Sequence, residues 1–363
     1  MSRKSLLKFA LIAICSPLFI SNAISSTYKL PSQPLQNVVE QTKNVSTRLS
    51  PDKQWLAVLT PRTHLTINNL AANERKLAGL RVSKQSLTPS RVKYSYSAIE
   101  LVNLNNPTTN IQLPLANNMQ VANVSFSPDS RFLSYIGLTE IGANLYIYDI
   151  AKDATTQLNT GRLNATLGLK YLWKNNSKGI FTNLAIAHDT QAKATLAIAP
   201  NISQTIGKKA PRRTYQDLLK NPQDEAEFSA LTTSQLSLID LQGNSIAIGK
   251  PAINISYSLS PDDKYLMVKR VKAPFSYMVK YYDFAQSVEL FSTSGEHLTT
   301  LAQLESSEYR PPGSDAVRKG PRLIHWRTDK PSTLAFVQAL DKGDSRLKAA
   351  FRDQLLQLSA PFN

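Results

Sequence analysis

A ten-residue pattern built around Ser-Pro-Asp constrains the fold of this chain more than any other feature of its sequence. The pattern begins at Leu49, Phe126 and Leu259, and each copy continues through a few polar residues into an apolar run. Two degenerate copies, around Trp173 and Trp326, keep the same apolar frame. Proline presets φ for a turn, and Asp can hydrogen-bond to its own backbone, so each copy predicts a strand–turn–strand unit.

A second repeat alternates with the first. It consists of an apolar strand ending at a polar turn, and it occurs at residues 99–104, 145–150, 236–241, 288–291 and 354–358. After each of the first four copies, a short segment such as residues 155–158 returns as a partner strand. One hairpin of each kind makes four antiparallel strands, which is the content of a propeller blade with its period of about 40 residues. A β-sandwich with coincidental Ser-Pro-Asp turns is the alternative.

The sequence therefore predicts an all-β chain, a β-propeller of four-stranded antiparallel blades. We expect about five blades, at residues 45–115, 121–160, 166–250, 252–305 and 320–363, with the last incomplete because it lacks its outer strand. The first and third are lengthened by insertions. Residues 67–81 are expected to contain a short helix, and residues 214–235 a helix capped by Asn221 with Pro222 at its first position.

The N-terminus has the pattern of a secretory signal peptide. Arg3, Lys4 and Lys8 precede the apolar residues 9–20, and Ser21 and Ala23 supply the small side chains of a cleavage site. We expect a signal peptide at residues 1–23, a lead segment at 24–44 and a partial propeller domain at 45–363, in a protein exported to the periplasm or secreted. A buried N-terminal helix is the alternative, and Pro17 counts against it.

The number of cysteines and the length of the apolar runs further limit the class of protein. The single cysteine, Cys15, lies within the expected signal peptide and excludes an intramolecular disulfide framework. No apolar run reaches the 18 residues that a membrane span requires, so we expect a protein that does not span a membrane.

The net charge of +16 raises the question of a nucleic-acid partner. The basic clusters, at residues 208–213 and 269–272, are short and accompany no nucleic-acid-binding motif. We therefore expect no nucleic-acid partner, and attribute the charge to a solvated surface or to attraction for acidic substrates or an anionic envelope.

The sequence contains no recognisable catalytic or metal-binding motif. Gly-x-Ser-x-Gly does not occur, and residues 243–247 fail it at the final position, so the nucleophile elbow of an α/β-hydrolase is missing. The four histidines, at positions 64, 188, 297 and 325, have no second ligand at metal spacing. We expect no catalytic residue, metal site or cofactor within these residues.

Several segments outside the blade repeat carry a family resemblance. They are residues 77–81, 89–91, 209–222, 273–277, 313–322 and 338–344. In this order they resemble the N-terminal propeller of the prolyl oligopeptidase family of serine peptidases, in its glutamyl-endopeptidase-like branch. The resemblance covers nearly all of the chain after the expected signal peptide.

The resemblance implies an exported serine peptidase. In this family a propeller restricts access to an α/β-hydrolase domain that carries Ser, Asp and His. We expect the chain to end inside the propeller and to be inactive alone, with the hydrolase domain supplied in cis or in trans and with peptides or proteins as substrates. The alternative is a stand-alone periplasmic propeller that binds or scaffolds other proteins.

The same branch implies a cationic contact for an acidic substrate residue. Arg318 and Arg322, in a Gly- and Pro-rich segment between the last two blades, are the residues we expect to make it. A solvated or interdomain loop is the alternative for both positions.

Overall fold

The computed structural model describes residues 31–39, 44–62, 73–92, 94–116, 119–159, 161–186 and 215–362. The chain divides into two units, Met1–Gln41 and Thr42–Asn363. The described part of the first contains one helix, α1 (Gln33–Val39). The expected signal peptide at 1–23, and the lead segment up to residue 30, lie outside the described residues.

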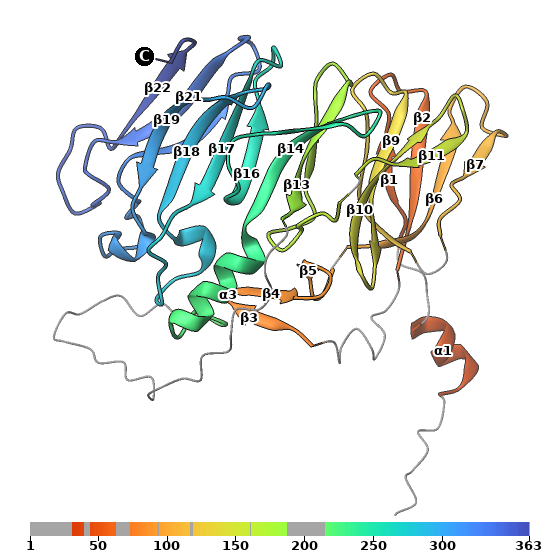
Figure 1. Ribbon diagram of the computed structural model, residues 1–363, viewed down its shortest axis with the longest axis horizontal. Helices are drawn as coiled ribbons and strands as arrows, with labels where there is room; N and C mark the ends of the chain where they lie inside the picture. The colour runs from red at the N-terminus through yellow and green to blue at the C-terminus, as the bar shows by residue number, and fades with distance from the viewer. Residues whose placement is uncertain are drawn as a thin grey trace, which may run out of the picture. The chain divides into compact units, whose positions relative to one another are not determined.

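The second unit is built from antiparallel sheets that follow one another along the chain (Figure 1). Sheet I contains β1 (Ser46–Leu49), β2 (Trp55–Pro61), β6 (Tyr96–Asn103) and β7 (Asn110–Gln112). Sheet II contains β8 (Gln120–Phe126), β9 (Phe132–Thr139), β10 (Gly142–Asp149) and β11 (Ala154–Gln157). A single residue pair, Tyr96 with Val121, joins sheets I and II into one eight-stranded sheet.

Three more sheets complete the series. Sheet III contains β12 (Tyr171–Trp173), β13 (Gly179–Ala185), β14 (Ser234–Asp240) and β15 (Ser245–Ala247). Sheet IV contains β16 (Ile253–Leu259), β17 (Tyr265–Val271), β18 (Gln286–Ser292) and β19 (His297–Leu304). Sheet V contains β20 (Pro321–Trp326), β21 (Thr333–Ala339) and β22 (Asp353–Ser359). The all-β class is confirmed, each of sheets I to V matches one predicted range to within one residue, and sheet V has three strands among the described residues, as expected.

The Ser-Pro-Asp segments form the turns that the sequence predicts. In the first, Ser50 Oγ donates to Asp52 Oδ1 at 2.5 Å and accepts the backbone N–H of Trp55 at 2.9 Å. The copies at Ser127 and Ser260 repeat both bonds. The residue directly after the Asp of the pattern (Lys53, Ser130 or Asp263) adopts a left-handed φ of 61° to 63° in all three turns. Each turn is therefore closed by its own side chains.

The turns also bond to one another from sheet to sheet. The Asp52 N–H donates to Ser130 Oγ at 3.0 Å, and the Asp129 N–H donates to Ser177 Oγ at 2.9 Å. Asp263 accepts the N–H groups of residues 175 and 176, both at 2.9 Å. Ser332 Oγ then donates to Asp262 Oδ2 at 2.5 Å. These bonds link the turns of sheets I to V in sequence order.

The apolar core lies between neighbouring sheets. Separate clusters of buried side chains join sheet I to II, II to III, III to IV and IV to V. As a result, β9 and β18 are buried on both faces, except for the exposed Thr139 and the partly exposed Ser292 at their ends. In sheet V, Trp326 and Leu334 face sheet IV, whereas Leu355 on the other face is 72% exposed.

One of the two insertions agrees with the helix expected for it and the other does not. Helix α3 (Pro222–Thr232) begins as predicted, because the Asn221 side chain accepts the N–H of Asp224 at 2.8 Å. Residues 73–81 instead contain β3 (Arg75–Leu77) and the start of β4 (Leu80–Ser83); β4 pairs with β3 on one side and with β5 (Thr88–Pro89) on the other. The expected short helix is wrong there, and residues 63–72 lie outside the described residues. No helix in the described part of the chain is long and apolar enough to cross a membrane.

Candidate functional site

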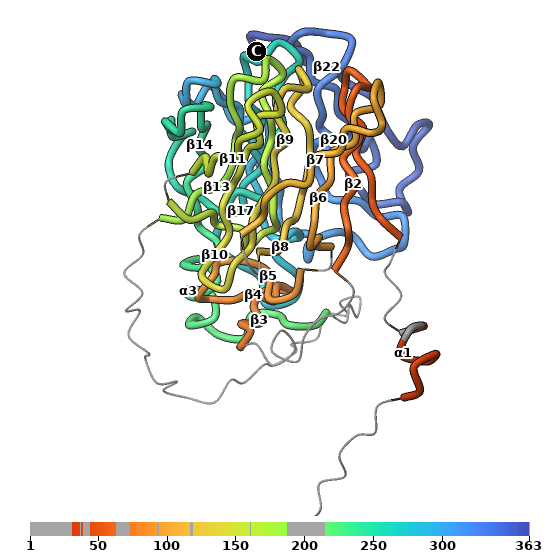
Figure 2. The backbone as a smooth tube through the Cα atoms, turned by 90° about the vertical axis from the view of Figure 1, so that its right-hand side faces the viewer, coloured from red at the N-terminus to blue at the C-terminus, as the bar shows by residue number. Residues whose placement is uncertain are grey.

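The long connections of the sheets gather at one end of the strands. Antiparallel strands alternate in direction, so connections from the second to the third strand, and from one sheet to the next, lie opposite the Ser-Pro-Asp turns. Figures 1 and 2 show α3 and β3–β5 together at this end. We call it the loop face and define it as residues 73–92, 215–233, 272–285, 305–320 and 340–352. It contains most of the described residues that carry the family resemblance.

These segments, which are far apart in sequence, are bonded to one another. The Gly79 N–H donates to Asp217 O at 2.8 Å, and Arg81 Nε donates to Asp217 Oδ2 at 2.6 Å. The Tyr281 N–H donates to Ala78 O at 2.9 Å. Three resemblance segments or their immediate neighbours thus form one connected structure.

An aromatic cluster lies beneath these contacts. Phe228 of α3 meets Phe275 and Phe284 edge to face, with ring centroids 5.1 and 5.7 Å away. Phe275 and Phe284 stack at 5.6 Å. Phe228 and Phe284 are fully buried, so this cluster anchors the helix and the 272–285 segment to the sheets.

Arg318 lies on the loop face, in the connection between sheets IV and V, as expected. Its Nη2 donates to Asp283 O at 2.8 Å and to Phe284 O at 3.3 Å. Burial lowers the pKa of Arg318; the Asp283 carboxylate opposes this shift, and the charge of Arg310 adds to it. No carboxylate among the described residues forms an ion pair with Arg318, so its hydrogen bonds go to backbone carbonyls, and the Asp283 carboxylate acts on its charge only from a longer distance.

Arg322 is placed differently from the expectation. It lies on β20 rather than in the loop, opposite Val337 of β21. Its Nη2 is 2.5 Å from Asp353 Oδ2 of β22, and its other terminal nitrogen is buried with no hydrogen-bond partner in the part of the chain that the structure describes. The structure thus gives the two arginines different partners.

Two further cations lie close to Arg318. The Nε of Arg310 is buried without a hydrogen-bond partner among the described residues. Burial lowers the pKa of Lys269 on β17, and the positive charge of Arg318 lowers it further. Sequence reasoning noted the basic run containing Lys269 but missed Arg310, because nothing in the local sequence marks a buried guanidinium.

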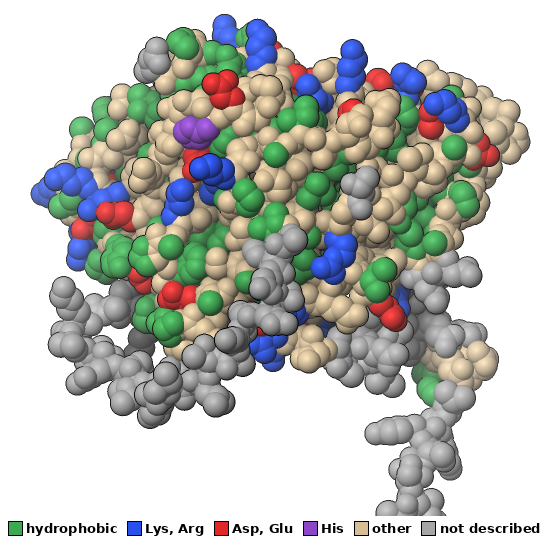
Figure 3. All heavy atoms as spheres, viewed as in Figure 1, with side chains coloured by type: hydrophobic (Ala, Val, Ile, Leu, Met, Phe, Trp, Pro, Cys, Tyr) green, Lys and Arg blue, Asp and Glu red, His purple; other side chains and the backbone are tan. Residues whose placement is uncertain are grey.

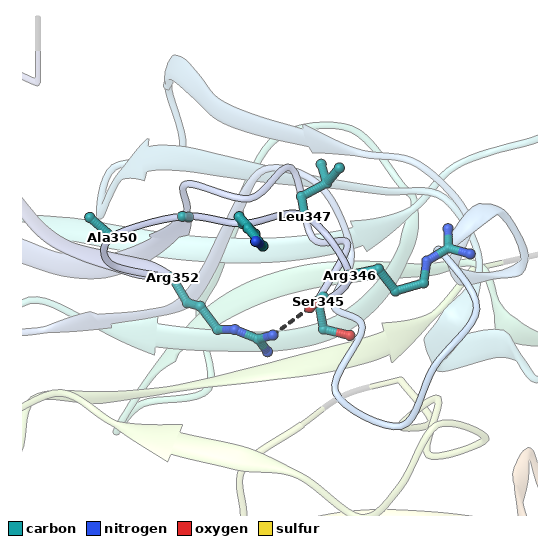
Figure 4. A pocket seen from close by; sticks show the side chains of 7 residues that line it. Ser345, Arg346, Leu347, Ala350 and Arg352 are labelled. Atoms are coloured by element: carbon teal, nitrogen blue, oxygen red, sulfur yellow. Dashed lines mark hydrogen bonds between the residues drawn. The ribbon is translucent and has the colours of Figure 1, made fainter.

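A second loop-face feature is a cavity of about 500 Å³ within residues 345–352. Figure 4 shows the Arg352 side chain directed at the backbone of Ser345, whose carbonyl oxygen accepts a 2.5 Å bond, whereas Arg346 points away. Arg346 pairs instead with Asp344 at 2.7 Å. Both arginines of this loop are therefore engaged within it.

Two of the four histidines, His297 and His325, lie within the described residues, and the Nε2 of His297 is 3.4 Å from the Thr300 hydroxyl oxygen. His297 packs its ring 5.2 Å from that of Phe291, and His325 is a β20 residue whose Nδ1 is 2.7 Å from Leu323 O. His64 and His188 lie outside the described residues, as do Lys208 and Lys209. Within the described ranges, no group of three His, Cys, Asp or Glu side chains is placed to hold a metal ion. On the face seen in Figure 3, Lys and Arg are spread among other side chains rather than gathered into one patch.

Comparison with known proteins finds two plant relatives. The chain is 32% identical over 341 residues to a probable chloroplastic glutamyl endopeptidase of Oryza sativa subsp. japonica. It is 29% identical over 355 residues to the Arabidopsis thaliana protein of the same description. These alignments cover 90% and 93% of this chain but only 36% of each relative. The relatives support the resemblance to the prolyl oligopeptidase family.

Solved structures are similar at lower identity. An acylaminoacyl peptidase of Pyrococcus horikoshii aligns with 86% of this chain and 38% of its own, at 11% identity and a TM-score of 0.42. TolB of Acinetobacter baumannii aligns with 90% and 64%, at 11% identity and a TM-score of 0.32. No family model matches the chain.

Proposed function

We propose that this chain is the propeller portion of an exported serine peptidase of the prolyl oligopeptidase family, and that it controls substrate access. The observation that carries the proposal is the 32% identity to a probable glutamyl endopeptidase across 90% of the chain. The face-to-face packing of sheets I to V and the bonds between their turns support a radial arrangement of blades.

On this proposal peptide hydrolysis takes place outside these 363 residues. They contain no Gly-x-Ser-x-Gly, and the plant relatives are nearly three times as long as the aligned region. An α/β-hydrolase domain, in cis or in trans, supplies Ser, Asp and His. The loop face, with its connected long segments, is the surface at which we place contacts with peptide substrate and with that domain.

Two measurements test this proposal. An antibody against residues 31–363, used on envelope and secreted fractions, should detect either a species far heavier than 40 kDa or a complex containing a second chain. That species should be labelled by a fluorophosphonate probe and should cleave peptides, whereas the purified 363-residue chain should do neither. An unlabelled species of about 40 kDa without a hydrolase partner would instead favour a stand-alone periplasmic binding propeller.

Export is tested by the N-terminal sequence of the purified native protein. Cleavage after Ala23 is expected for the signal peptide at residues 1–23. A native protein that retains residues 1–23 and stays in the cytoplasm would contradict this part of the proposal.

Within the peptidase we propose Arg318, rather than Arg322, as the contact for an acidic substrate residue. Arg322 forms an ion pair with Asp353, whereas Arg318 has no ion-pair partner among the described residues and feels the Asp283 carboxylate only from a longer distance. In the active assembly, Arg318→Ala should lower kcat/KM for cleavage after Glu by roughly tenfold or more relative to cleavage after Gln. Arg322→Ala is the matched control and should leave the ratio unchanged. An equal loss on both substrates would show that Arg318 only holds the loop in place.

A further inference from the structure

Sheet V differs from the other four sheets along its outer edge. In sheets I to IV the third strand (β6, β10, β14 or β18) is paired on its outer side with a fourth strand. The third strand of sheet V is β22, and no strand in the described ranges pairs with its outer side. Asp353 is the only charged residue of β22, which contains no proline. Charged residues and proline protect edge strands from pairing, so β22 is left open to a further strand.

One side chain of β22 is exposed where its equivalents are buried. The register between the second and third strands places Leu355 at the position held in sheets I to IV by Ile99, Leu145, Leu236 and Val288. Those four side chains are each 0% exposed, because each belongs to the apolar cluster shared with the next sheet. Leu355 is 72% exposed. The outward face of sheet V therefore has the side chain of a covered position without its cover.

The backbone at this position bonds to the outer strand in the complete sheets. In sheets I to III its carbonyl oxygen accepts the N–H of an aliphatic residue that directly follows the outer strand: Leu113 to Ile99 O at 3.0 Å, Leu158 to Leu145 O at 2.8 Å, and Ile248 to Leu236 O at 2.8 Å. The three aliphatic side chains are at most 3% exposed and lie in the same clusters as the position they bond to. A strand added to β22 would place such a side chain beside Leu355 and supply a donor to Leu355 O.

Strand β22 also ends in the kind of turn that precedes an outer strand. In β14, β18 and β22 the carbonyl oxygen of the last strand residue accepts the N–H three residues later: Gly243 to Asp240 O at 3.1 Å, Gly295 to Ser292 O at 3.0 Å, and Phe362 to Ser359 O at 2.8 Å. The outer strands that follow the first two turns run antiparallel to the third strand. The geometry at the end of β22 is therefore that of a sheet with an antiparallel outer strand.

We propose that the outer edge of β22 binds an extended polypeptide segment as an antiparallel fourth strand, followed by a leucine or isoleucine. The N–H of that aliphatic residue bonds to Leu355 O, and its side chain packs beside Leu355. Main-chain hydrogen bonds hold the segment, and the aliphatic residue sets its register. The strand belongs to the part of the peptidase outside these 363 residues; this source rests on the proposed function, whereas the open edge does not.

A graft of the chain's own outer strand tests the proposal. A copy of residues 154–160, which contain β11 and Leu158, is added directly after Asn363. Residues 360–363 then take the place of the turn 150–153 of sheet II, so that the copied leucine reaches Leu355 O. The copied asparagine can accept the Leu355 N–H, as Asn159 Oδ1 accepts the N–H of Leu145 at 2.6 Å. The matched control is the same graft carrying Leu158→Asp.

Hydrogen exchange followed by mass spectrometry measures the effect on β22. The β22 amides should exchange roughly tenfold or more slowly in the grafted chain, which is the factor expected from covering one leucine. The Leu158→Asp graft should exchange like the chain without a graft. The amides of β10 are the internal reference for folding and should exchange equally in all three proteins.

Three results would overturn parts or all of the proposal. Equally fast exchange of β22 in the graft and in its Leu158→Asp control would show that the edge does not bind a strand. Slow exchange of β22 in the chain without a graft, together with a dimer mass by light scattering, would show that a second copy occupies the edge. A protected β22 in the graft, with a native species that no fluorophosphonate probe labels, would support the edge and overturn only its assignment to a peptidase.

Discussion

Replacing Arg270 should destabilise this protein more than any exposed charge change, because Arg270 forms a buried ion pair inside sheet IV. Arg270 and Glu289 are each 8% exposed, and the Nη1–Oε2 distance is 3.0 Å. Arg270 Nε also donates to Asn254 Oδ1 at 3.0 Å, and the guanidinium lies 4.6 Å from the Phe291 ring centroid. The variant Arg270→Met removes these bonds but keeps an apolar stem against Phe291.

The magnitude follows from what Glu289 would retain. Breaking one half of a buried ion pair costs about 3–5 kcal/mol, because the other charge is left uncompensated. Glu289 would keep the Ser287 hydroxyl at 2.6 Å and Lys272 at 3.6 Å, which places the expected loss near the lower limit, about 3 kcal/mol. Arg270→Met combined with Glu289→Leu removes both charges and should lie within about 1 kcal/mol of the native protein.

Urea unfolding followed by tryptophan fluorescence and by circular dichroism measures both free energies, provided that the two probes give one transition. Lys152→Met controls for a general effect of charge, and should move the midpoint far less. A loss below about 1 kcal/mol in Arg270→Met, or a double variant as unstable as the single one, would refute the reasoning.

Two further predictions concern the turn geometry and pH. Gly343→Ala should destabilise the folded protein by about 1–3 kcal/mol, because a Cβ there would lie 2.3 Å from Val317 O at a φ of +79°. Gly161→Ala is the control and should leave the stability unchanged, because the space around Gly161 is open. Thermal melts compare the two variants. Stability should also fall as the pH is lowered from about 5 toward 2, because the folded-state pKa values of Glu289 and Asp262 lie below their ordinary values. These carboxylates contribute their stabilisation above the unfolded-state pKa and lose it as they are protonated in the folded state. Urea midpoints measured across this pH range should therefore fall as the pH falls. If Glu289 accounts for most of the loss, the midpoint of the double variant Arg270→Met and Glu289→Leu should change little with pH.

The sequence predicted local structure correctly wherever the hydrogen-bonding partners of a segment lie within that segment. The turn at Ser50 closes through Asp52, and Asn221 caps α3, because donor and acceptor lie within five residues of each other. The expected helix at 67–81 failed over residues 73–81 because Leu77 and Val82 are buried against Phe228, a residue 146 or more positions later in the chain. Contacts with such distant residues override local preference.

The candidate site residues show the same difference between what local sequence and what distant contacts decide. The sequence pointed to Arg318 and Arg322 as equivalent, and only the tertiary structure separates them, by pairing Arg322 with Asp353 across sheet V. Arg310 could not be singled out from the sequence, because the burial of its Nε depends on segments that are distant in the chain. Burial and counter-ions are properties of the assembled sheets.

The sequence by itself determined the all-β class, the division into five strand groups and the positions of the Ser-Pro-Asp turns, because recurring apolar runs and Ser-Pro-Asp act within a few residues. Only the tertiary structure decided which loops meet on the loop face, and which cations there have a carboxylate partner. The physical reason is range: turns and strands are set by neighbours in sequence, whereas desolvation and charge pairing are set by neighbours in space.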